Sequence, residues 1–313
     1  MIEIPDEIQA RIEELIAKKE PSALQKAYLR LQERYRGERS FRLETEEEHL
    51  SYLLARFPGT FAAASKVIVR LSEMDPSFQP QTLLDLGSGP GTALLAASNY
   101  FPIKQATLVE QNSIFIKLGS SLLQNIPHEY LKTSFSELKI TNSYDMILAS
   151  YSLSETDEAI ANSLITQALD HCTYLVLIEP GTPYGFSRLL SYRTHAIQQG
   201  AFCLAPCPHE KKCPMGTGWC HFSERLPRTH FQKMVKHASL GYEDEKYSYV
   251  ILSKKVIPHS MARIVQTPKK HSGHVQLVLC TTSGNLESKT VSKRHKDLYK
   301  LARDAEWGDL TAE

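Results

Sequence analysis

Three cysteines lie close together in the second half of the chain, in a segment rich in proline and glycine. Cys207, Cys213 and Cys220 are separated by five and six residues. An irregular segment lets several thiolates converge on one point, because no regular backbone hydrogen bonding competes with ligation. The spacing differs from the C-x2-C knuckle of common zinc sites, whereas three close cysteines and a remote one are seen in [4Fe–4S] sites. The segment therefore predicts a [4Fe–4S] cluster, with Cys280 as the remote ligand.

The same cysteines allow two alternatives to the cluster. His209 or His221 could complete a zinc site with three of the cysteines. The cysteines could also be buried thiols that bind no metal. Of the six cysteines in the chain, the other two are Cys172 and Cys203. We expect both of these to be core thiols.

A glycine-rich loop follows a short apolar run that predicts a buried strand. Gly87, Gly89 and Gly91 come directly after residues 82–86, which include Asp85. Glycines allow the backbone to turn tightly and to approach a ligand closely, and the Ala-rich helix expected after the loop presents unpaired N–H groups. The loop predicts a site for a nucleotide-like ligand, and a tight turn without a ligand is the alternative.

A carboxylate follows where a nucleotide-binding fold places its ribose ligand. Glu110 ends the next predicted strand, 19 residues beyond Gly91, and a carboxylate there accepts hydrogen bonds from ribose hydroxyls. A dinucleotide-binding loop would carry a small residue at Thr92. The observed loop, with an acidic residue before it, resembles motif I of class I S-adenosylmethionine-dependent methyltransferases. This resemblance implies S-adenosyl-L-methionine as cofactor, bound by Asp85, Gly87, Ser88, Gly89, Gly91 and Glu110.

The sequence does not assign catalytic residues to this fold. Amino-group methyltransferases commonly carry an Asn/Asp-Pro-Pro-aromatic tetrad after strand four, where a polar acceptor holds the target amine in line with the sulfonium. The corresponding segment here, residues 150–155, reads Ser-Tyr-Ser-Leu-Ser-Glu. Ser152 or Glu155 could contact a substrate, or could form part of the pocket wall.

The elements that must position these residues follow a βα pattern. Short apolar runs at 82–86, 106–110, 130–135, 144–149 and 174–179 are separated by helical stretches, which predicts a mostly parallel sheet. Two later runs, 247–253 and 275–280, are expected to pair antiparallel at the sheet edge. Helical spacing before residue 75 predicts four helices, the last capped by Thr60 after a break at Pro58-Gly59.

We therefore predict an α/β fold: a class I S-adenosylmethionine methyltransferase (Rossmann-like) sheet with an N-terminal helical layer and a cysteine-rich metal-binding insert. The expected division has four parts. These are the helical region at 1–75, the α/β core at 76–199, the cysteine-rich insert at 200–230, and the C-terminal strands of the core with a basic tail at 231–313.

The charge of the chain is divided unevenly. All 313 residues together carry 36 Lys+Arg and 35 Asp+Glu, a net +1, but residues 182–303 hold 20 Lys+Arg and 7 Asp+Glu. This part has a balance of +13, and the rest of the chain has −12. Such an excess of basic residues predicts phosphate contacts with nucleic acid. The candidates are Arg188, Arg193, Lys211, Lys212, Arg225, Arg228, Lys233, Lys236, Lys269, Lys270, Lys293, Arg294 and Lys296.

Composition sets the remaining expectations. With 42% hydrophobic and 23% charged residues, the chain has an ordinary soluble composition. No run approaches the ~18–20 apolar residues of a membrane span, and the first residues show neither a basic leader nor an apolar signal segment. We expect a cytoplasmic protein that is monomeric when free and has no membrane partner.

Several segments together resemble one family, the methyltransferase-like proteins that act on the mitochondrial small ribosomal subunit, and their bacterial relatives. The resemblance covers about residues 40–310. The segments that carry it are Gly87-Ser88-Gly89-Pro90-Gly91-Thr92, Pro206-Cys207-Pro208-His209, Cys213-Pro214, Trp219-Cys220-His221-Phe222, Arg225, Arg228, Val291-Ser292-Lys293 and Trp307-Gly308-Asp309.

This resemblance implies a class I methyltransferase fold with an iron–sulfur cluster on Cys207, Cys213, Cys220 and Cys280. It also implies action in small-subunit assembly and translation through rRNA, with ribosomal proteins as further partners. In this family methyl transfer has been hard to assign, and we expect little or no turnover. An active rRNA methyltransferase is one alternative function, and a small-molecule methyltransferase with a structural zinc site is another.

Overall fold

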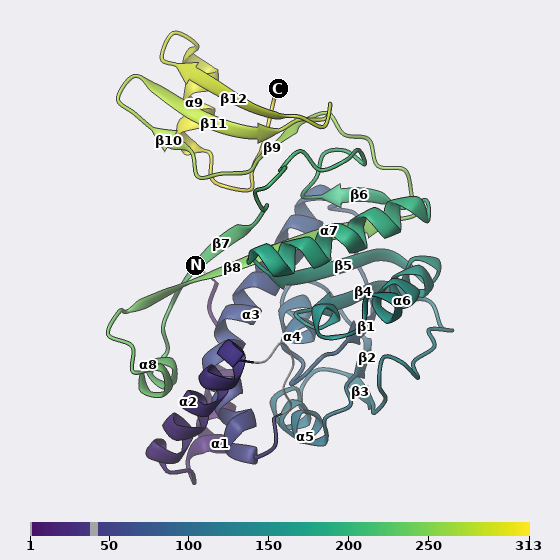
Figure 1. The fold of residues 1–313 in the computed structure, drawn as a ribbon, viewed down its shortest axis with the longest axis vertical. Helices are drawn as coiled ribbons and strands as arrows, with labels where there is room; N and C mark the ends of the chain where they lie inside the picture. Colours follow the sequence, from purple (N-terminus) through teal and green to yellow (C-terminus); the bar gives the residue numbers. More distant parts are fainter. Residues whose placement is uncertain (1, 38–42) are drawn as a thin grey trace.

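The computed structural model describes residues 2–37 and 43–313, without the side chains of 34–37. Met1 and residues 38–42, which belong to the predicted N-terminal helical region, lie outside the described residues. The described chain forms a large central sheet with helices on both faces and a smaller second sheet at one end, opposite the N-terminal helices (Figure 1).

The central sheet has the strand order β3-β2-β1-β4-β5-β8-β6, with β7 beside β8. Neighbouring strands from β3 to β5 are parallel, and β8 runs antiparallel to β5, β6 and β7. The five predicted βα strands are confirmed, the third with shifted bounds, and the strand order reverses direction between β1 and β4. The strands are β1 Thr82–Leu86, β2 Gln105–Val109, β3 His128–Leu131, β4 Tyr144–Ser150, β5 Cys172–Pro180, β6 Phe202–Ala205, β7 Phe222–Pro227 and β8 Tyr242–Ser253.

Helices cover both faces of this sheet because successive strand residues point to opposite sides. Leu83 of β1 belongs to the buried cluster that includes residues of α1, α3, α4 and α5, whereas Leu84 belongs to the cluster that includes residues of α6 and α7. None of the helices in the described part of the chain has the length and apolar character needed to cross a membrane. The helices are α1 Asp6–Ile16, α2 Pro21–Gly37, α3 Glu46–Met74, α4 Thr92–Ser98, α5 Ser113–Leu122, the 3-10 turn η1 Leu153–Glu155, α6 Glu158–Asp170, α7 Pro183–Gln198, α8 His230–Lys236 and α9 Lys296–Asp304.

Helix α3 is one continuous helix of 29 residues, so the predicted break at Pro58-Gly59 is wrong. Proline removes one backbone donor from a helix, but Phe57 and Phe61 on either side of it are almost fully buried. This packing keeps the helix intact, and the Thr60 hydroxyl bonds back to the carbonyl of Arg56 at 3.1 Å instead of capping a new helix.

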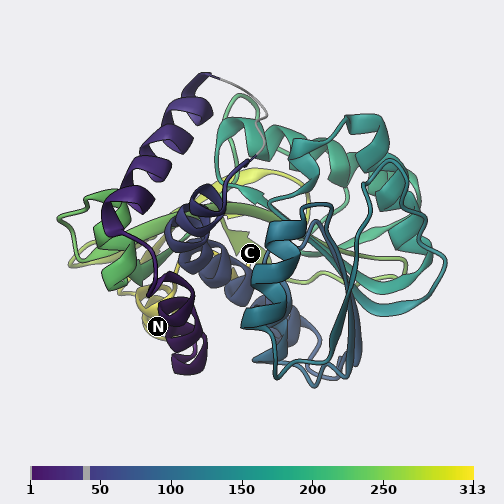
Figure 2. The same ribbon diagram turned by 90° about the horizontal axis from the view of Figure 1, so that it is seen from below.

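Helix α8 lies beside α2, although nearly 200 residues separate them along the chain (Figure 2). The amide nitrogen of Gln25 donates to the carbonyl of Met234 at 3.1 Å. The hairpin of β7 and β8 carries α8 at its tip. The predicted N-terminal layer therefore packs against the C-terminal half of the chain as well as against the βα core.

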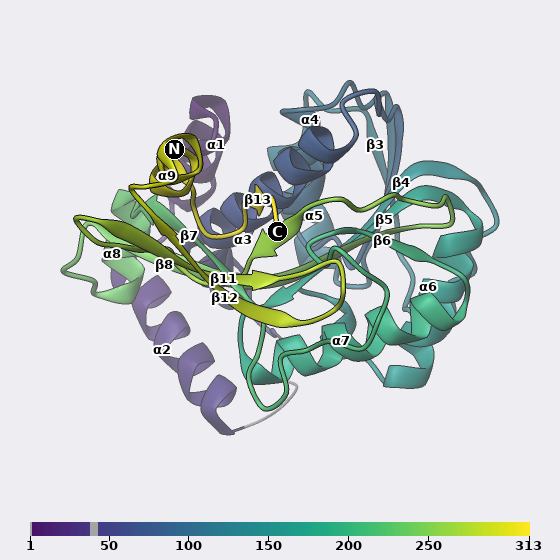
Figure 3. The ribbon, with the colours of Figure 1, turned by 90° about the horizontal axis from the view of Figure 1, so that it is seen from above.

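A second sheet is built from residues 262–311 (Figure 3). The predicted pairing of 247–253 with 275–280 is wrong, because β8 already has β5 on one side and β6 and β7 on the other. Strand β11 pairs instead with β12, across the short turn that follows Cys280. The strands are β9 Ala262–Ile264, β10 Lys269–Lys270, β11 His274–Cys280, β12 Leu286–Ser292 and β13 Leu310–Thr311, in the order β10-β11-β9-β13 with β12 beside β11.

Candidate cofactor site and cysteine cavity

The glycine loop is fixed to the carboxyl ends of β1 and β2. The N–H groups of Gly87 and Ser88 both donate to the carbonyl of Val109, at 2.9 and 3.0 Å. Gly91 then begins α4 as its N-cap residue and donates to the carbonyl of Ser88 at 2.9 Å. The loop is therefore held by backbone hydrogen bonds, at the position where the strand order reverses. Ligands of open α/β sheets bind at this point.

The three glycines of the loop have left-handed φ angles, but they meet different surroundings. A Cβ on Gly87 would lie 2.5 Å from Cβ of Ser152, and one on Gly91 would collide with Leu123. A Cβ on Gly89 would meet nothing within 4 Å. Gly87 and Gly91 are thus required for packing, and Gly89 is the position where the backbone faces open space and a ligand can approach.

Glu110 lies directly against this loop. Its Oε2 accepts the N–H of Gly89 at 2.9 Å, and its Oε1 accepts the N–H of Asn112 at 2.7 Å. Each carboxylate oxygen has a further lone pair. The structure therefore brings Glu110 and Gly89 together, as expected for a loop and carboxylate that share a ligand.

Two further carboxyls are buried at the same edge of the sheet. Asp85 and Glu179 are each 1% exposed, at the ends of β1 and β5. Within the described residues, Asp85 Oδ2 and Glu179 Oε2 have no hydrogen-bond partner, whereas Glu179 Oε1 accepts the N–H of Ser154 at 3.0 Å. Burial raises the pKa of each carboxyl to about 7. An unsatisfied buried oxygen is costly, so these atoms fit a ligand that carries donors or positive charge.

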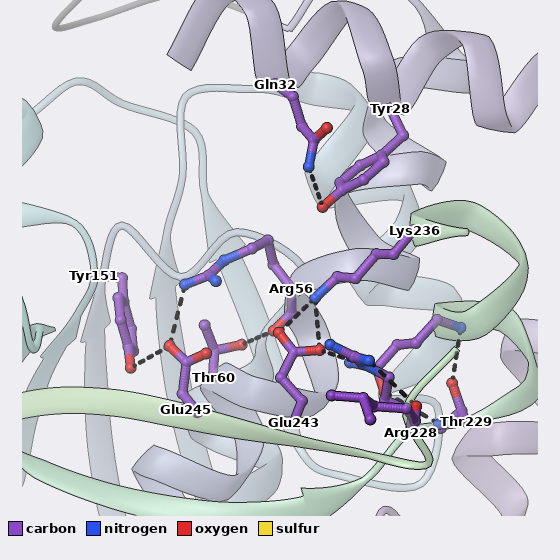
Figure 4. Close-up of polar contacts among 12 residues, drawn as sticks. Tyr28, Gln32, Arg56, Thr60, Tyr151, Arg228, Thr229, Lys236, Glu243 and Glu245 are labelled. Atoms are coloured by element: carbon purple, nitrogen blue, oxygen red, sulfur yellow. Dashed lines mark hydrogen bonds and ion pairs between the residues drawn. The ribbon is translucent and has the colours of Figure 1, made fainter. Parts of the chain in front are cut away.

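The end of β4, where a catalytic tetrad would stand, is occupied by a hydrogen-bonded network (Figure 4). Tyr151 adopts a left-handed φ of 57°. Its hydroxyl donates to Oε1 of Glu245 at 3.1 Å, and the Arg56 guanidinium lies 3.1 Å from the same oxygen. Gly59 makes room for this carboxylate, since a Cβ there would lie 2.6 Å from Oε2. Tyr151 is thereby tied to α3 and β8.

The two polar candidates after β4 occupy different environments. Ser152 is buried, and its hydroxyl donates to the carbonyl of Leu86 at 2.7 Å. It is therefore part of the wall behind the glycine loop. Glu155 ends the 3-10 turn η1 and is exposed.

The four predicted cysteine ligands line one largely apolar cavity. Cys207, Cys213, Cys220 and Cys280 contribute to its wall, together with residues of α7 and β8. All six cysteines are free thiols, and Cys203 is fully buried in the core, as predicted. Among the described residues, no three His, Cys, Asp or Glu side chains lie close enough to hold a metal ion. The cysteines therefore face the same space without forming a ligand set.

The two histidines considered as zinc ligands lie in different places. His209 is buried, with Nε2 3.4 Å from the sulfur of Cys280. Burial and the neighbouring Arg193 lower the pKa of His209 to about 4, which keeps the ring neutral. His221 instead packs between Trp219 and Trp307, with ring centroids 5.5 and 4.9 Å away. Of the two, only His209 could join the cysteines.

Two buried arginines flank the cysteine cavity. Arg193, predicted as an RNA contact, is only 5% exposed, lines the cavity and donates to the carbonyl of His209 at 2.6 Å. That prediction is wrong, because α7 points the side chain inward. Arg263 is 2% exposed and donates to the carbonyls of Pro206 and Gly308 at 3.0 and 2.8 Å. In the described part of the chain, the hydrogen-bond partners of Arg263 are uncharged. Arg193 also interacts with Cys207, and a hydrogen bond from Cys203 together with Arg193 lowers the pKa of the Cys207 thiol.

No role was predicted from the sequence for Arg263 or Glu179. A signal was present in both cases, since Arg263 interrupts the apolar run Ala-Arg-Ile-Val and Glu179 ends an apolar strand. A charged residue inside a buried run is rare unless it is paired or bound to a ligand. These positions could therefore have been identified as site residues before the fold was known.

Some basic residues predicted to contact RNA form ion pairs within the protein, and others are exposed. Arg188, Arg225, Arg228 and Lys236 form ion pairs with carboxylates, the last two with Glu243 (Figure 4). An exposed basic group remains on the second sheet and at the start of α9. It comprises Lys269, Lys270, Lys293, Arg294 and Lys296.

Comparison with known proteins identifies relatives of the chain. Residues 46–312 match the family described as mitochondrial small ribosomal subunit Rsm22. The chain is 32% identical over 292 residues to the human ribosome assembly protein METTL17, mitochondrial, which covers 85% of this chain and 63% of that protein. It is 22% identical to the ribosome assembly protein RSM22, mitochondrial, of Saccharomyces cerevisiae, over 87% of this chain and 67% of that protein. The chain thus spans under two thirds of the human relative.

Solved methyltransferase structures also resemble the chain at low identity. A putative RNA methyltransferase from Pyrococcus horikoshii matches with a TM-score of 0.46 and 14% identity, over 74% of this chain and 98% of that one. Magnesium protoporphyrin IX methyltransferase from Synechocystis matches with a TM-score of 0.42 and 10% identity, over 82% of this chain and 100% of that one.

These relatives correct the expected location and settle the family. The prediction of a cytoplasmic protein is wrong, since the curated relatives from human, fission yeast and budding yeast are all named as mitochondrial. The family match covers most of the chain, including the glycine loop and all four cavity cysteines. The chain belongs to the Rsm22 family of mitochondrial small-ribosomal-subunit proteins.

Proposed function

We propose that this protein is a mitochondrial assembly factor of the small ribosomal subunit that binds S-adenosyl-L-methionine and carries a [4Fe–4S] cluster. The glycine loop, Asp85 and Glu110 would hold the cofactor, Cys207, Cys213, Cys220 and Cys280 would hold the cluster, and the exposed basic group would contact rRNA. Ribosomal proteins would be further partners. The relatives named as ribosome assembly proteins support this function.

The single observation that carries the proposal is the cysteine cavity with its two buried arginines. A buried guanidinium is strongly disfavoured without an opposite charge. Among the described residues, Arg263 has only uncharged hydrogen-bond partners. Arg193 already favours the thiolate of Cys207, since Cys203 and Arg193 lower the pKa of that thiol. Four cysteine thiolates around a cluster would place net negative charge between the two arginines, so the residues present fit a thiolate-bound centre.

Analysis of the anaerobically purified protein tests this centre. A [4Fe–4S] protein contains iron and acid-labile sulfide in equal amounts and absorbs broadly near ~400 nm. Zinc without sulfide would favour the alternative site of three cysteines and His209, which the contact between His209 and Cys280 supports. Absence of both metals would overturn the proposed centre.

The cofactor proposal is supported by the atoms around the glycine loop. Gly89 faces open space, Glu110 has free lone pairs, and Asp85 and Glu179 each carry an unsatisfied buried oxygen. When bound, the cofactor would supply an activated methyl group and a positive sulfonium. Calorimetry with S-adenosylmethionine and S-adenosylhomocysteine tests binding directly, and no heat of binding with either would overturn it.

Little or no methyl transfer is part of the proposal. The network of Tyr151, Glu245 and Arg56 stands where an acceptor-holding tetrad would be needed, and its polar atoms bond to one another. Mapping rRNA modifications with and without the gene tests this part. A methyl group lost with the gene, and restored by the purified protein on the rRNA, would establish the alternative of an active rRNA methyltransferase.

A further inference from the structure

His49 of α3 is a buried histidine with one unsatisfied ring nitrogen. The residue is 0% exposed, and Nδ1 lies 2.7 Å from the carbonyl of Thr45. A carbonyl can only accept a hydrogen bond, so Nδ1 carries the proton and Nε2 of the neutral ring is an acceptor. Within the described residues, Nε2 has no partner. The buried ring therefore presents an acceptor to a donor that those residues do not supply.

The ring is fixed beside the segment that holds Glu110. Phe115 meets the His49 ring edge-on, with centroids 4.8 Å apart. Phe115 lies in the first turn of α5, which follows Glu110 after only two residues. Burial raises the pKa of Glu110, and the backbone N–H groups of Asn112 and Gly89 oppose that rise. Helix α3 thus brings His49 against the segment that follows the carboxylate at the end of β2.

The start of α3 makes this placement rigid. Thr45 caps the helix through a capping box with Glu48, in which each side chain bonds the other residue's backbone. Because the same Thr45 also accepts from Nδ1, the cap fixes both the helix start and the ring orientation. A ring held by a backbone carbonyl and an aromatic neighbour loses little freedom on binding a ligand.

We propose that His49 is a cofactor-binding residue, and that its Nε2 accepts a hydrogen bond from one ribose hydroxyl while Glu110 accepts from the other. This inference rests on the proposed cofactor at the glycine loop. The ribose diol offers two donors, and His49 Nε2 and the Glu110 carboxylate each offer an acceptor. The N-terminal helical layer then contributes to the site, in addition to packing against the core.

Binding of S-adenosylhomocysteine to the full chain, measured by calorimetry, tests the proposal with two substitutions. His49→Asn keeps a side-chain amide that can donate to Thr45 but has no atom at the position of Nε2, so affinity should fall between about 3- and 10-fold, the value of one hydrogen bond. His49→Gln places an amide oxygen near Nε2 and should bind within about 2-fold of the original protein.

His195→Asn is the control. Its Nε2 lies 2.8 Å from the hydroxyl oxygen of Thr166, and the residue is half-buried. His195 lies in the last turn of α7, on the face of the sheet that α6 and α7 cover, whereas α3 covers the other face. Its substitution should leave affinity unchanged. Unfolding midpoints of all three variants confirm that each is folded.

A second ligand locates the contact on the cofactor. 5′-Methylthioadenosine retains the ribose and lacks the amino-acid part, so His49→Asn should weaken both ligands by the same factor. A loss seen only with S-adenosylhomocysteine would place His49 at the amino-acid part and overturn the ribose contact. If His49→Asn binds both ligands with unchanged affinity, the role proposed for His49 is wrong, and the proposed cofactor site stands. If the original protein binds neither ligand, the proposed cofactor itself is wrong.

Discussion

The glycine-loop site and the cysteine cavity are built in opposite ways. Asp85, Gly89 and Glu110 come from one contiguous βαβ unit, and backbone hydrogen bonds hold them in place. The cavity instead joins the irregular segment around Cys207–Cys220 to Cys280 of the second sheet, through the buried Arg263. The first site depends on local geometry, and the second depends on the docking of two distant parts of the chain.

The two regions also bury groups of opposite charge. Asp85 and Glu179 have unsatisfied buried oxygens at the glycine-loop site, whereas beside the cavity Arg263 has uncharged partners among the described residues and Arg193 favours the thiolate of Cys207. A buried charge is tolerated when an opposite charge completes it. The acidic site suits the positive sulfonium that we propose there, and the basic cavity suits thiolates around a cluster.

The largest expected effect separates the two sites. Cys220→Ser should lose most of its iron and acid-labile sulfide, because a serine hydroxyl replaces one thiolate ligand. S-adenosylhomocysteine affinity should change by less than about 2-fold, since distant sites are usually additive. Metal analysis and calorimetry on one preparation check both statements.

Two substitutions control this experiment. Cys172→Ser changes a cysteine that begins β5, away from the cavity, and should retain its iron. Gly89→Ala is the reciprocal change, which should lose the ligand and keep the metal, because a Cβ would occupy the open space at the loop. If Cys220→Ser or Gly89→Ala lost both the metal and the S-adenosylhomocysteine, the two sites would form a single unit. The contrast drawn between them would then be wrong.

Arg263→Met should cause the next largest effect. The carbonyls of Pro206 and Gly308 would lose their donor in a buried position, which should lower the free energy of unfolding by about 3 kcal/mol. Chemical denaturation of the metal-loaded protein measures this loss. Arg225→Met removes an exposed arginine that pairs with Asp244 and should have little effect. Equal losses in the two variants would contradict the structural role of Arg263.

The same contrast explains what the sequence could predict. The βα strands, the glycine loop and the position of Glu110 follow from patterns within about thirty residues, and the structure confirms them. The pairing of 275–280 depended on which edges of the sheet were free, and no local pattern contains that information. The role proposed for His49 depends on a long-range contact with Phe115. The predicted helix break at Pro58 was wrong because rules based on local sequence do not include the burial of Phe57 and Phe61.

The pH dependence of stability should reveal the buried carboxyl at the glycine loop. Burial raises the pKa of Asp85 to about 7, against about 3.9 in an unfolded chain. The folded state therefore binds more protons between these values, and its stability falls as pH rises through this window. Asp85→Asn should remove about 2 kcal/mol of this fall between pH 5 and 8.

Urea denaturation at several pH values measures the free energy of unfolding of the original protein and of Asp85→Asn, and so gives the pH dependence of each. Asp170→Asn, at the exposed end of α6, is the control and should keep the original pH dependence. An Asp85→Asn protein with the original dependence would show that the pKa of Asp85 is not raised in the folded state. This carboxylate would then be compensated within the protein, and the contrast between the two sites would lose one of its two carboxyls.

The smallest effect concerns the exposed basic group of the second sheet. Lys269 and Lys270 form β10, and both are exposed. If each contacts one RNA phosphate, replacing both by Gln should reduce the slope of log affinity against log salt by up to about 2. Titration of a structured RNA oligonucleotide at several salt concentrations measures the slope.

Lys18→Gln is the control. It changes an exposed lysine of the acidic part of the chain and should leave the salt slope unchanged. A slope that fell equally for Lys18 would mean that RNA binding follows net charge alone, whereas a slope lowered only by the β10 pair would locate the RNA contact on the sheet that also supplies Cys280.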